Sequence, residues 1–396
     1  MKRSLIITIG IVIILLILGL WVYLLVFGTP KTPRDVFANI GVLDPAQRET
    51  STSTLPVGTP SQKETPTQLS LSGSQLQQLT TRSVAGFAFA SSSDNTLRYV
   101  ERGTGYVYEI NLDSGIEKQI TLTTIPQTIA AVFSRDASEV VFTSYTSEGT
   151  KQVLLGEIKD GSTEMTTTQL PNSAENIAFK NNQTIYFTQT TPTETIGYTF
   201  NVDTLKQTQL FALDVPDMQM RWGASLDAMY AQTKPTKYLE GYLYTISKGA
   251  LIPVGQAGYG LTAFLNNTYS VISMIQNNSR YSAESLSNAG IEIQSIAMLP
   301  EKCVFSPTQT SSVWCAAPLV PSNADYVELW YKGILNSEDY LWSTDLEKGK
   351  STVVADLQTL SSRSIDVSLL EINTQGTMLL FENKIDGTLW LYKIGK

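Results

Sequence analysis

The sequence contains no histidine, and this absence narrows the chemistry that its other side chains could perform. Without imidazole there can be no Ser-His-Asp or Cys-His nucleophile system, no histidine general base and no imidazole ligand for zinc. Catalysis would have to use carboxylates, Lys or Tyr, or a calcium-type site built from oxygen ligands.

The Asp and Glu residues show no fixed spacing that would mark such a site. The run Asn111 to Gly115, for example, is a turn sequence and lacks the spaced ligands and distal Glu of a calcium loop. We therefore expect no catalytic residue, no metal site and no cofactor. A pair of carboxylates brought together from separate segments, as in a glycoside hydrolase, is left open as the alternative.

Cys303 and Cys315 are the two cysteines of the chain. They lie in the run KCVFSPTQTSSVWCA, and the midpoint between them falls near Gln309, so a hairpin here would place them directly opposite each other. Directly opposed residues have Cβ atoms about 4.5–5.5 Å apart, and a modest further approach allows a disulfide. We predict this bridge for a domain outside the cytoplasm, with two buried thiols as the alternative.

The segment LWYKGILNSEDYLWSTD concentrates aromatic and charged side chains. Exposed on a loop, such side chains could bind a glycan or a protein partner. The competing interpretation, which the pattern favours, is that the Trp and Leu side chains cover the edge of a sheet while the charges face water. The candidate binding residues are Trp330, Tyr331, Lys332, Glu338, Asp339, Tyr340 and Trp342.

These residues belong to a chain built from repeated units of short strands. One strand type reads LRYV, EVVFTS, TIYFTQ, AMYAQ, YSVIS, VWCAA and MLLFEN, and it recurs about every 43 residues, with one longer step before the last unit. A period of this length with four short strands per unit is typical of a β-propeller. The sequence therefore predicts an all-β, seven-bladed propeller over residues 73–396, with six or eight blades, or an open β-sandwich, as the alternatives.

The last unit, residues 361–396, lacks a recognisable fourth strand after TLWLYKI. Residues 74–80, SQLQQLT, resemble the fourth-strand sequence KQTQL of another unit. We expect residues 74–80 to add the outer strand to the last blade, which closes the ring and removes an exposed strand edge.

One unit, AAVFSRDASEVVFTS, is similar to the repeats of TolB-like or WD40-like bacterial propellers. Phe133, Ser134 and Asp136 match that pattern, whereas Arg135 and Ala137 replace its Pro and Gly. In this motif the aromatic residue packs between blades and the Ser and Asp side chains cap a turn. The resemblance implies a propeller that serves as a binding platform, although some propellers of this type carry hydrolase or lyase sites.

Residues 4–27 read SLIITIGIVIILLILGLWVYLLVF and contain no charged side chain. A helix over this run would cross the ~30 Å hydrocarbon core of a bilayer. We predict a transmembrane helix, with a cleaved signal peptide as the alternative. Residues 1–3 would then be cytoplasmic, and residues 28–72, rich in Ser, Thr, Pro and Gln, would form a flexible stalk.

The formal net charge of −8 argues against nucleic acid as a partner. The segment around Trp330 also resembles one in uncharacterised, single-helix-anchored propeller proteins of candidate-phyla-radiation bacteria (Patescibacteria), which implies a cell-envelope location. The expected function is that of a single-pass plasma-membrane protein whose extracytoplasmic propeller is a scaffold for an envelope protein or a surface polymer. The alternative is a carboxylate-dependent, carbohydrate-active enzyme with its site in the propeller funnel.

Overall fold

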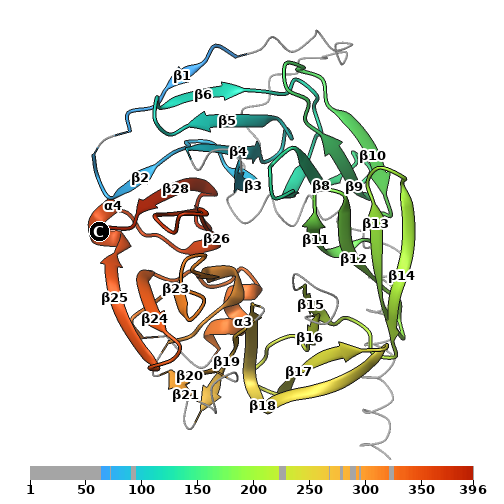
Figure 1. Cartoon of the computed structure of the whole chain (residues 1–396), viewed down its shortest axis with the longest axis vertical. Coiled ribbons are helices and arrows are strands. Elements are labelled where there is room, and N and C mark those ends of the chain that lie inside the picture. Colours follow the sequence, from blue (N-terminus) through green and yellow to red (C-terminus); the bar gives the residue numbers. More distant parts are fainter. Residues whose placement is uncertain are drawn as a thin grey trace, which may run out of the picture. The chain divides into compact units, whose positions relative to one another are not determined.

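Figure 1 shows the computed structural model, which describes residues 64–71, 73–90, 95–222, 229–266, 268–276, 280–285, 291–293, 296–320 and 325–395. The predicted membrane-spanning helix of residues 4–27 and residues 28–63 of the predicted stalk lie outside these ranges. Within the described ranges, the helices are all too short or too polar to span a bilayer.

The described residues fold into an all-β propeller of six hydrogen-bonded sheets arranged in a ring (Figure 1). Neighbouring strands within each sheet are antiparallel. Sheet 1 has the order β1 (Thr67–Gln68), β6 (Ile116–Gln119), β5 (Val107–Asn111), β4 (Thr96–Glu101) and β3 (Val84–Phe89). Sheet 2 has the order β10 (Thr166–Leu170), β9 (Lys151–Glu157), β8 (Glu139–Tyr145) and β7 (Thr128–Phe133).

The remaining sheets follow in chain order around the ring. Sheet 3 has the order β11 (Glu175–Asn181), β12 (Thr184–Thr190), β13 (Thr195–Asn201) and β14 (Lys206–Leu213). Sheet 4 has the order β15 (Gln219–Arg221), β16 (Tyr230–Gln232), β17 (Glu240–Ser247), β18 (Ala250–Leu265), β19 (Ser270–Gln276), β20 (Arg280–Ser285) and β21 (Ile291–Ile293). Sheet 5 has the order β22 (Cys303–Phe305), β23 (Ser312–Ala317), β24 (Tyr340–Asp345) and β25 (Lys350–Asp356). Sheet 6 has the order β2 (Leu76–Gln78), β28 (Thr388–Lys393), β27 (Met378–Asn383) and β26 (Val367–Ile372).

The sequence predicts seven blades, whereas the described residues form six sheets, so the count of seven separate blades is not confirmed. The difference arises in sheet 4, where the 16-residue strand β18 runs through two repeat units. Its first part pairs with β17 and its last part, from Tyr259 onward, pairs with β19. Gly260 has a positive φ of 62°, and the register with β19 shifts between Tyr259 and Thr262. The strand continues through this irregularity and joins the two units into one sheet.

The described part of the chain contains three short helices between the strands. The 3-10 helix η3 (Pro300–Lys302) leads into β22, α3 (Tyr326–Tyr331) lies between β23 and β24, and α4 (Leu357–Ser361) follows β25. Figure 1 places α3 beside the middle of the ring, where β26 is also the strand of sheet 6 nearest the middle. The insertion that the repeat spacing predicts in the sixth unit therefore contains a helix.

Sheet 6 combines strands from the two ends of the described chain. The sequence predicts an outer strand within residues 74–80, and β2 lies there, with Leu76 paired to Tyr392 and Gln78 paired to Trp390. The backbone N–H of Leu79 also donates to the carbonyl of Leu389 at 2.8 Å.

The boundary predicted for the flexible stalk needs correction at its C-terminal end. Residues 64–71 lie against sheet 1, where β1 pairs with β6 and the N–H of Leu69 donates to the carbonyl of Gly115 at 2.7 Å. Leu69 and Leu71 pack against the core cluster that includes Tyr99. Burial of these two leucines explains why this end of the segment joins the propeller.

The turn between β7 and β8 shows the capping that the Ser-Arg-Asp-Ala-Ser motif predicts. Asp136 Oδ1 accepts hydrogen bonds from the Ser134 hydroxyl at 2.8 Å and from the backbone N–H of Ser138 at 3.0 Å. Ala137, which replaces the Gly of the family pattern, has a positive φ of 56°. The turn thus keeps the glycine-type backbone conformation although the residue has changed.

Candidate functional site

A group of buried charges lies where sheets 5 and 6 meet α3. Lys302, the last residue of η3, is fully buried. Its Nζ donates hydrogen bonds to Asp339 Oδ2 and Asp366 Oδ1, each at 2.6 Å, and to Ser337 Oγ at 2.7 Å. Asp339 directly precedes β24 and Asp366 directly precedes β26. Buried charges are tolerated when they are paired and hydrogen-bonded in this way.

Trp330 and Lys384 complete the group. The indole Nε1 of Trp330 donates to both carboxylate oxygens of Asp366, at 2.9 and 3.1 Å. Lys384 Nζ lies 3.5 Å from Asp366 Oδ2 and donates to the carbonyl of Leu335 at 3.0 Å. The ammonium groups of Lys302 and Lys384 lie 4.9 and 4.7 Å from the centroid of the Trp330 ring. We refer to the following residues as the buried charge cluster: Lys302, Trp330, Ser337, Asp339, Asp366 and Lys384.

Burial and ion pairing shift the pKa values of this cluster in opposite directions. Burial raises the pKa of the Asp339 carboxyl above its ordinary value, although the Lys302 ammonium opposes that shift. Burial would lower the pKa of Lys302, but Asp339 and Asp366 outweigh it and the pKa is raised. Burial lowers the pKa of Lys384, and the nearby Lys302 ammonium adds to the effect.

The structure separates the residues of the predicted binding loop. Trp330 and Asp339 are buried, with exposed fractions of 5% and 1%, so they do not project from an exposed loop as the sequence predicts. Their burial follows from pairing with Lys302 and Asp366. Tyr331 is partly buried, and its hydroxyl donates to Glu301 Oε2 at 2.6 Å.

The other predicted loop residues lie nearer the surface. Lys332 is exposed and forms an ion pair with Glu328 of α3 at 2.5 Å. Glu338 is exposed and Tyr340 is partly buried. Both line a small pocket beside Leu319 and Val320, separate from the larger pocket described below. The loop is therefore no continuous aromatic surface, because its large rings pack inward.

Four residues of the buried charge cluster are not among the candidates that the sequence gives: Lys302, Ser337, Asp366 and Lys384. Ser337 lies within the predicted loop segment, and the other three lie outside it. Lys302 stands in LPEKCVF, Asp366 in RSIDVSL and Lys384 in ENKIDG, and none of these runs carries a motif. The one local signal for these residues is a charged side chain next to the apolar residues of a strand. Such a charge needs a partner if it is buried.

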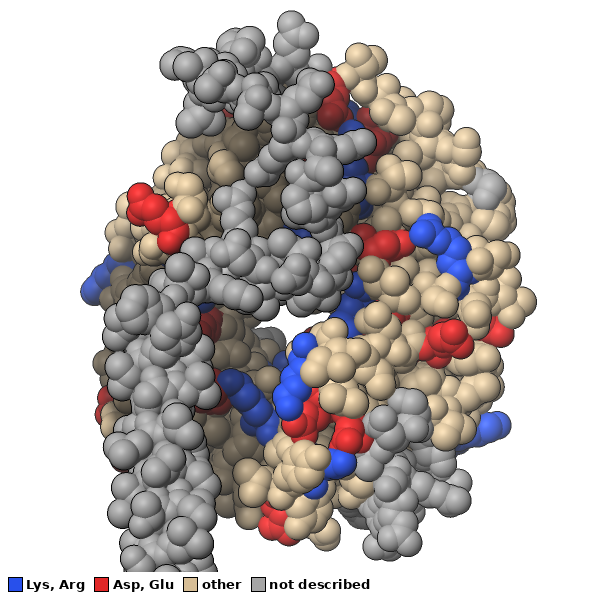
Figure 2. Space-filling model, turned by 180° about the vertical axis from the view of Figure 1, so that it is seen from behind, with Lys and Arg blue, Asp and Glu red and all other residues tan. Residues whose placement is uncertain are grey.

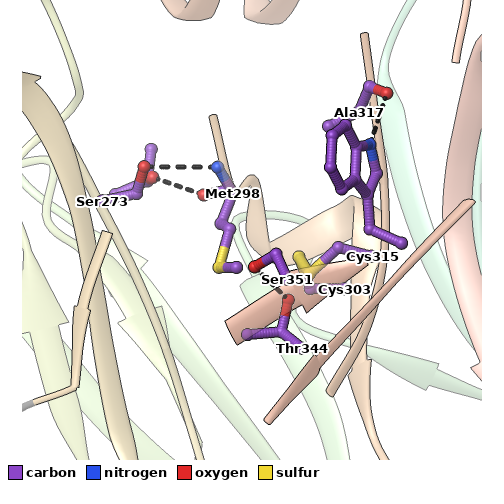
Figure 3. The surroundings of a disulfide bond; sticks show 9 residues. Ser273, Met298, Cys303, Cys315, Ala317, Thr344 and Ser351 are labelled. Carbon is purple, nitrogen blue, oxygen red and sulfur yellow. Dashed lines mark hydrogen bonds between the residues drawn. A yellow bond between two sulfur atoms is a disulfide. The ribbon is translucent and has the colours of Figure 1, made fainter. Parts of the chain in front are cut away.

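Cys303 and Cys315 form a disulfide and are directly paired across β22 and β23, with Cα atoms 4.1 Å apart (Figure 3). Trp342, the last residue of the predicted binding loop, packs against the hydrophobic cluster that contains both cysteines. Its Nε1 donates to the carbonyl of Ala317 at 3.1 Å. Figure 3 also shows the hydroxyls of Thr344 and Ser351 within hydrogen-bond distance, at 2.9 Å. The bridge fixes the start of the hairpin next to Lys302.

An open pocket of about 620 Å³ lies beside the buried charge cluster, with Trp330 and Lys384 in its wall. Figure 2 shows an opening in the middle of the ring with Lys and Arg side chains beside it. The other charged side chains of the pocket wall form ion pairs: Glu382 with Arg102 at 3.0 Å, Asp386 with Arg363 at 3.0 Å, and Glu301 with Arg221 at 3.3 Å. The pocket thus has a charged but internally paired lining.

Sheet 6 also carries two carboxyl groups with raised pKa values. Burial raises the pKa of Glu371 on β26 to about 8. Burial also raises the pKa of Glu382 on β27, against the ion pair with Arg102. Glu371 pairs with Leu380, which stands two residues before Glu382, so both carboxyl groups project from the same face of the sheet.

Comparison with known proteins finds no matching family model and no matching curated protein. Similar solved structures exist. An oligogalacturonate lyase in complex with manganese has a TM-score of 0.56 and 11% identity, over 85% of this chain and 97% of that one. A β-propeller domain from Myceliophteria thermophila has a TM-score of 0.52 and 12% identity, over 81% and 100% of the two chains.

The β-propeller domain of the Trilobed protease from Pyrococcus furiosus has a TM-score of 0.50 and 8% identity, over 79% of this chain and 98% of that one. These proteins include both a lyase and the propeller of a protease, at identities too low to transfer an activity. The comparisons therefore show the fold of this chain, a β-propeller.

Proposed function

We propose that this protein is a membrane-tethered binding propeller that recognises an envelope protein or a surface polymer at the ring face containing the 620 Å³ pocket. The observation that carries the proposal is the internal pairing of the charged groups of the pocket. Each pair holds its side chains in place and leaves a shaped, polar surface.

Exposed apolar residues at the rim of the pocket also suit it to binding a partner. Leu369 and Ile385 line it and are 43% and 44% exposed, so apolar contact area is available beside the paired charges. Apolar anchors surrounded by polar groups are typical of protein-binding surfaces.

The tether is proposed from residues 4–27, whose length and lack of charge fit a bilayer-spanning helix. With the N-terminus in the cytoplasm, the propeller would lie outside the plasma membrane. The full chain should sediment with membranes and resist extraction by alkaline carbonate, and a chain lacking residues 1–27 should not.

Site-specific photo-crosslinking tests the binding proposal. A photo-reactive phenylalanine analogue in place of Ile385, at the pocket rim, should give a discrete crosslinked product in membranes of the producing cell. Ile116 on β6, at 41% exposure, is the matched control on the outer part of sheet 1 and should give none. Equal products from both positions, or none from Ile385, would contradict the proposed binding face.

A second candidate function, a carboxylate-dependent carbohydrate-active enzyme, is favoured by Glu371 and Glu382. A carboxyl with a pKa of about 8 is protonated at neutral pH and could act as a general acid. Under this hypothesis the purified full chain should depolymerise an envelope polysaccharide, and both Glu371→Gln and Glu382→Gln should abolish the cleavage. An inactive wild-type protein would remove this candidate.

A further inference from the structure

We propose that the buried charge cluster is a site of covalent modification, at which Lys302 Nζ and Asp339 Cγ become joined by an isopeptide bond that the chain forms itself. This inference concerns the propeller alone and does not depend on the proposed function.

The first support is the position of the two reacting groups. The side chains of Lys302, Asp339 and Asp366 are each 0% exposed, and Lys302 Nζ lies 2.6 Å from an oxygen of each carboxylate. Groups held at this separation react with effective concentrations of about 10⁵ M or more when they are well oriented. Exclusion of water also protects the amide product from hydrolysis.

The second support is that the two carboxylates differ in a way that assigns a role to each. Asp339 accepts the backbone N–H of Val367 on Oδ2 at 2.8 Å and the Ser337 hydroxyl on Oδ1 at 2.8 Å, and the same hydroxyl lies farther from Asp366 Oδ1, at 3.0 Å. Donors on both oxygens can stabilise the negative charge that develops when an amine attacks the carboxyl carbon. Asp339 is therefore the electrophile.

Asp366 is placed to carry protons. Its Oδ1 accepts a hydrogen bond from Lys302 Nζ, and its two oxygens are oriented by the indole N–H of Trp330. Asp366 also has a second cation, Lys384, at 3.5 Å, whereas in the described part of the chain no second ammonium or guanidinium pairs with Asp339. After the bond forms, Asp366 and Lys384 remain as a balanced ion pair.

The reaction balances without an added reactant. The Lys302 ammonium passes one proton to Asp339, and the resulting neutral amine attacks Asp339 Cγ to form a C–N bond. The nitrogen then passes a second proton to Asp366 and keeps its last hydrogen as the amide N–H. One C–O bond of Asp339 then breaks, and its oxygen leaves as water with the proton of the acid and the proton returned by Asp366. One ammonium and one carboxylate become one amide and one water, and Asp366 is regenerated.

The change in buried charge favours the product. The side chains of Lys302, Asp339 and Asp366 are held in the interior before the reaction, with Lys384 partly exposed beside them. Each fully buried ion carries a desolvation penalty of several kcal/mol. The amide replaces one of these ion pairs by a neutral group. The bond would join η3, the segment before β24 and, through Val367, the edge of β26.

Mass spectrometry of the purified full chain tests the proposal. The intact, denatured protein should be lighter by one water than the mass calculated from its sequence with one disulfide. Trypsin should leave Lys302 uncut and release residues 281–332 joined to residues 333–348, which contain Asp339.

Variants separate the roles of the two aspartates. Asp366→Asn, which keeps the size of the side chain, should return the mass calculated for its own sequence, and the matched control Asp345→Asn should keep the link. A wild-type mass equal to the calculated mass would overturn the proposal. A link from Lys302 to residues 364–384, which contain Asp366, would overturn the assignment of Asp339 as electrophile.

Discussion

At the scale of single residues, the carboxyl groups of this propeller differ in how their burial is compensated. Asp339 is fully buried and is matched by Lys302 at 2.6 Å. Glu371 is partly buried, and burial is the cause that raises its pKa to about 8. Its charged form is therefore disfavoured in the folded state relative to the unfolded chain.

This difference gives Glu371 a pH dependence with a defined sign. The folded pKa of about 8 lies above the ordinary value of 4.5 for a Glu carboxyl, so the folded state binds the proton more tightly. The resulting stabilisation is fully present below about pH 4.5 and is lost as the pH rises to about 8. Glu371→Gln, which resembles the protonated acid, should match wild type at pH 5. At pH 8.5 it should be more stable by about 2 kcal/mol, a value discounted for partial exposure.

Urea unfolding of both proteins at the two pH values provides the measurement. Ile385, a neutral residue in the turn after β27, offers a control substitution to Val, whose effect should not change between pH 5 and pH 8.5. A constant difference between wild type and Glu371→Gln at both pH values would contradict the assigned burial effect.

At the scale of secondary-structure elements, the disulfide closes the hairpin that leads from Lys302 into sheet 5. The bridge spans a sequence separation of 12 residues. Constraining a loop of that length in the unfolded chain contributes about 2–3 kcal/mol. The double variant Cys303→Ala/Cys315→Ala should therefore unfold at a lower denaturant concentration than the oxidised wild type.

Reduction provides the internal control for that comparison. Wild type unfolded under strong reductant should approach the double variant in stability, while the variant itself should not respond to reductant. If oxidised and reduced wild type unfold at the same denaturant concentration, the bridge does not stabilise the hairpin.

Many of these elements could be predicted from the sequence because their signals are local. Strands such as EVVFTSY show β-branched and aromatic residues flanked by turn residues, and the cysteines stand at equal distances from a hairpin midpoint. The continuity of β18 could not be predicted, because the repeat pattern divides residues 250–265 between two units. The partners of Lys302 could not be predicted either, because 37 and 64 residues separate it from Asp339 and Asp366.

At the scale of the whole molecule, closure of sheet 6 links the two ends of the described chain. Without β2, the edge of β28 would be unpaired, and unpaired edges recruit strands of other molecules. Leu76 and Leu79, with exposed fractions of 6% and 2%, would also lose their burial. Loss of two buried leucines costs roughly 4 kcal/mol or more.

A pair of truncations tests this closure. A chain beginning at Gly73 keeps β2 and should be monomeric, whereas a chain beginning at Ser83 lacks it and should melt at lower temperature and associate. Light scattering after gel filtration and thermal unfolding measure both properties. Identical behaviour of the two chains would show that β2 does not close the ring.

The uninterrupted strand β18 has a consequence for how the ring opens. Its 16 residues pair with β17 at one end and with β19 at the other, so neither repeat unit can separate from the other without breaking its own ladder. Local opening reactions tend to involve cooperative groups of elements. In hydrogen exchange, the amides of β17 and β19 should therefore become deuterated together, as one unit of fluctuation, while sheets 2 and 3 exchange independently of each other.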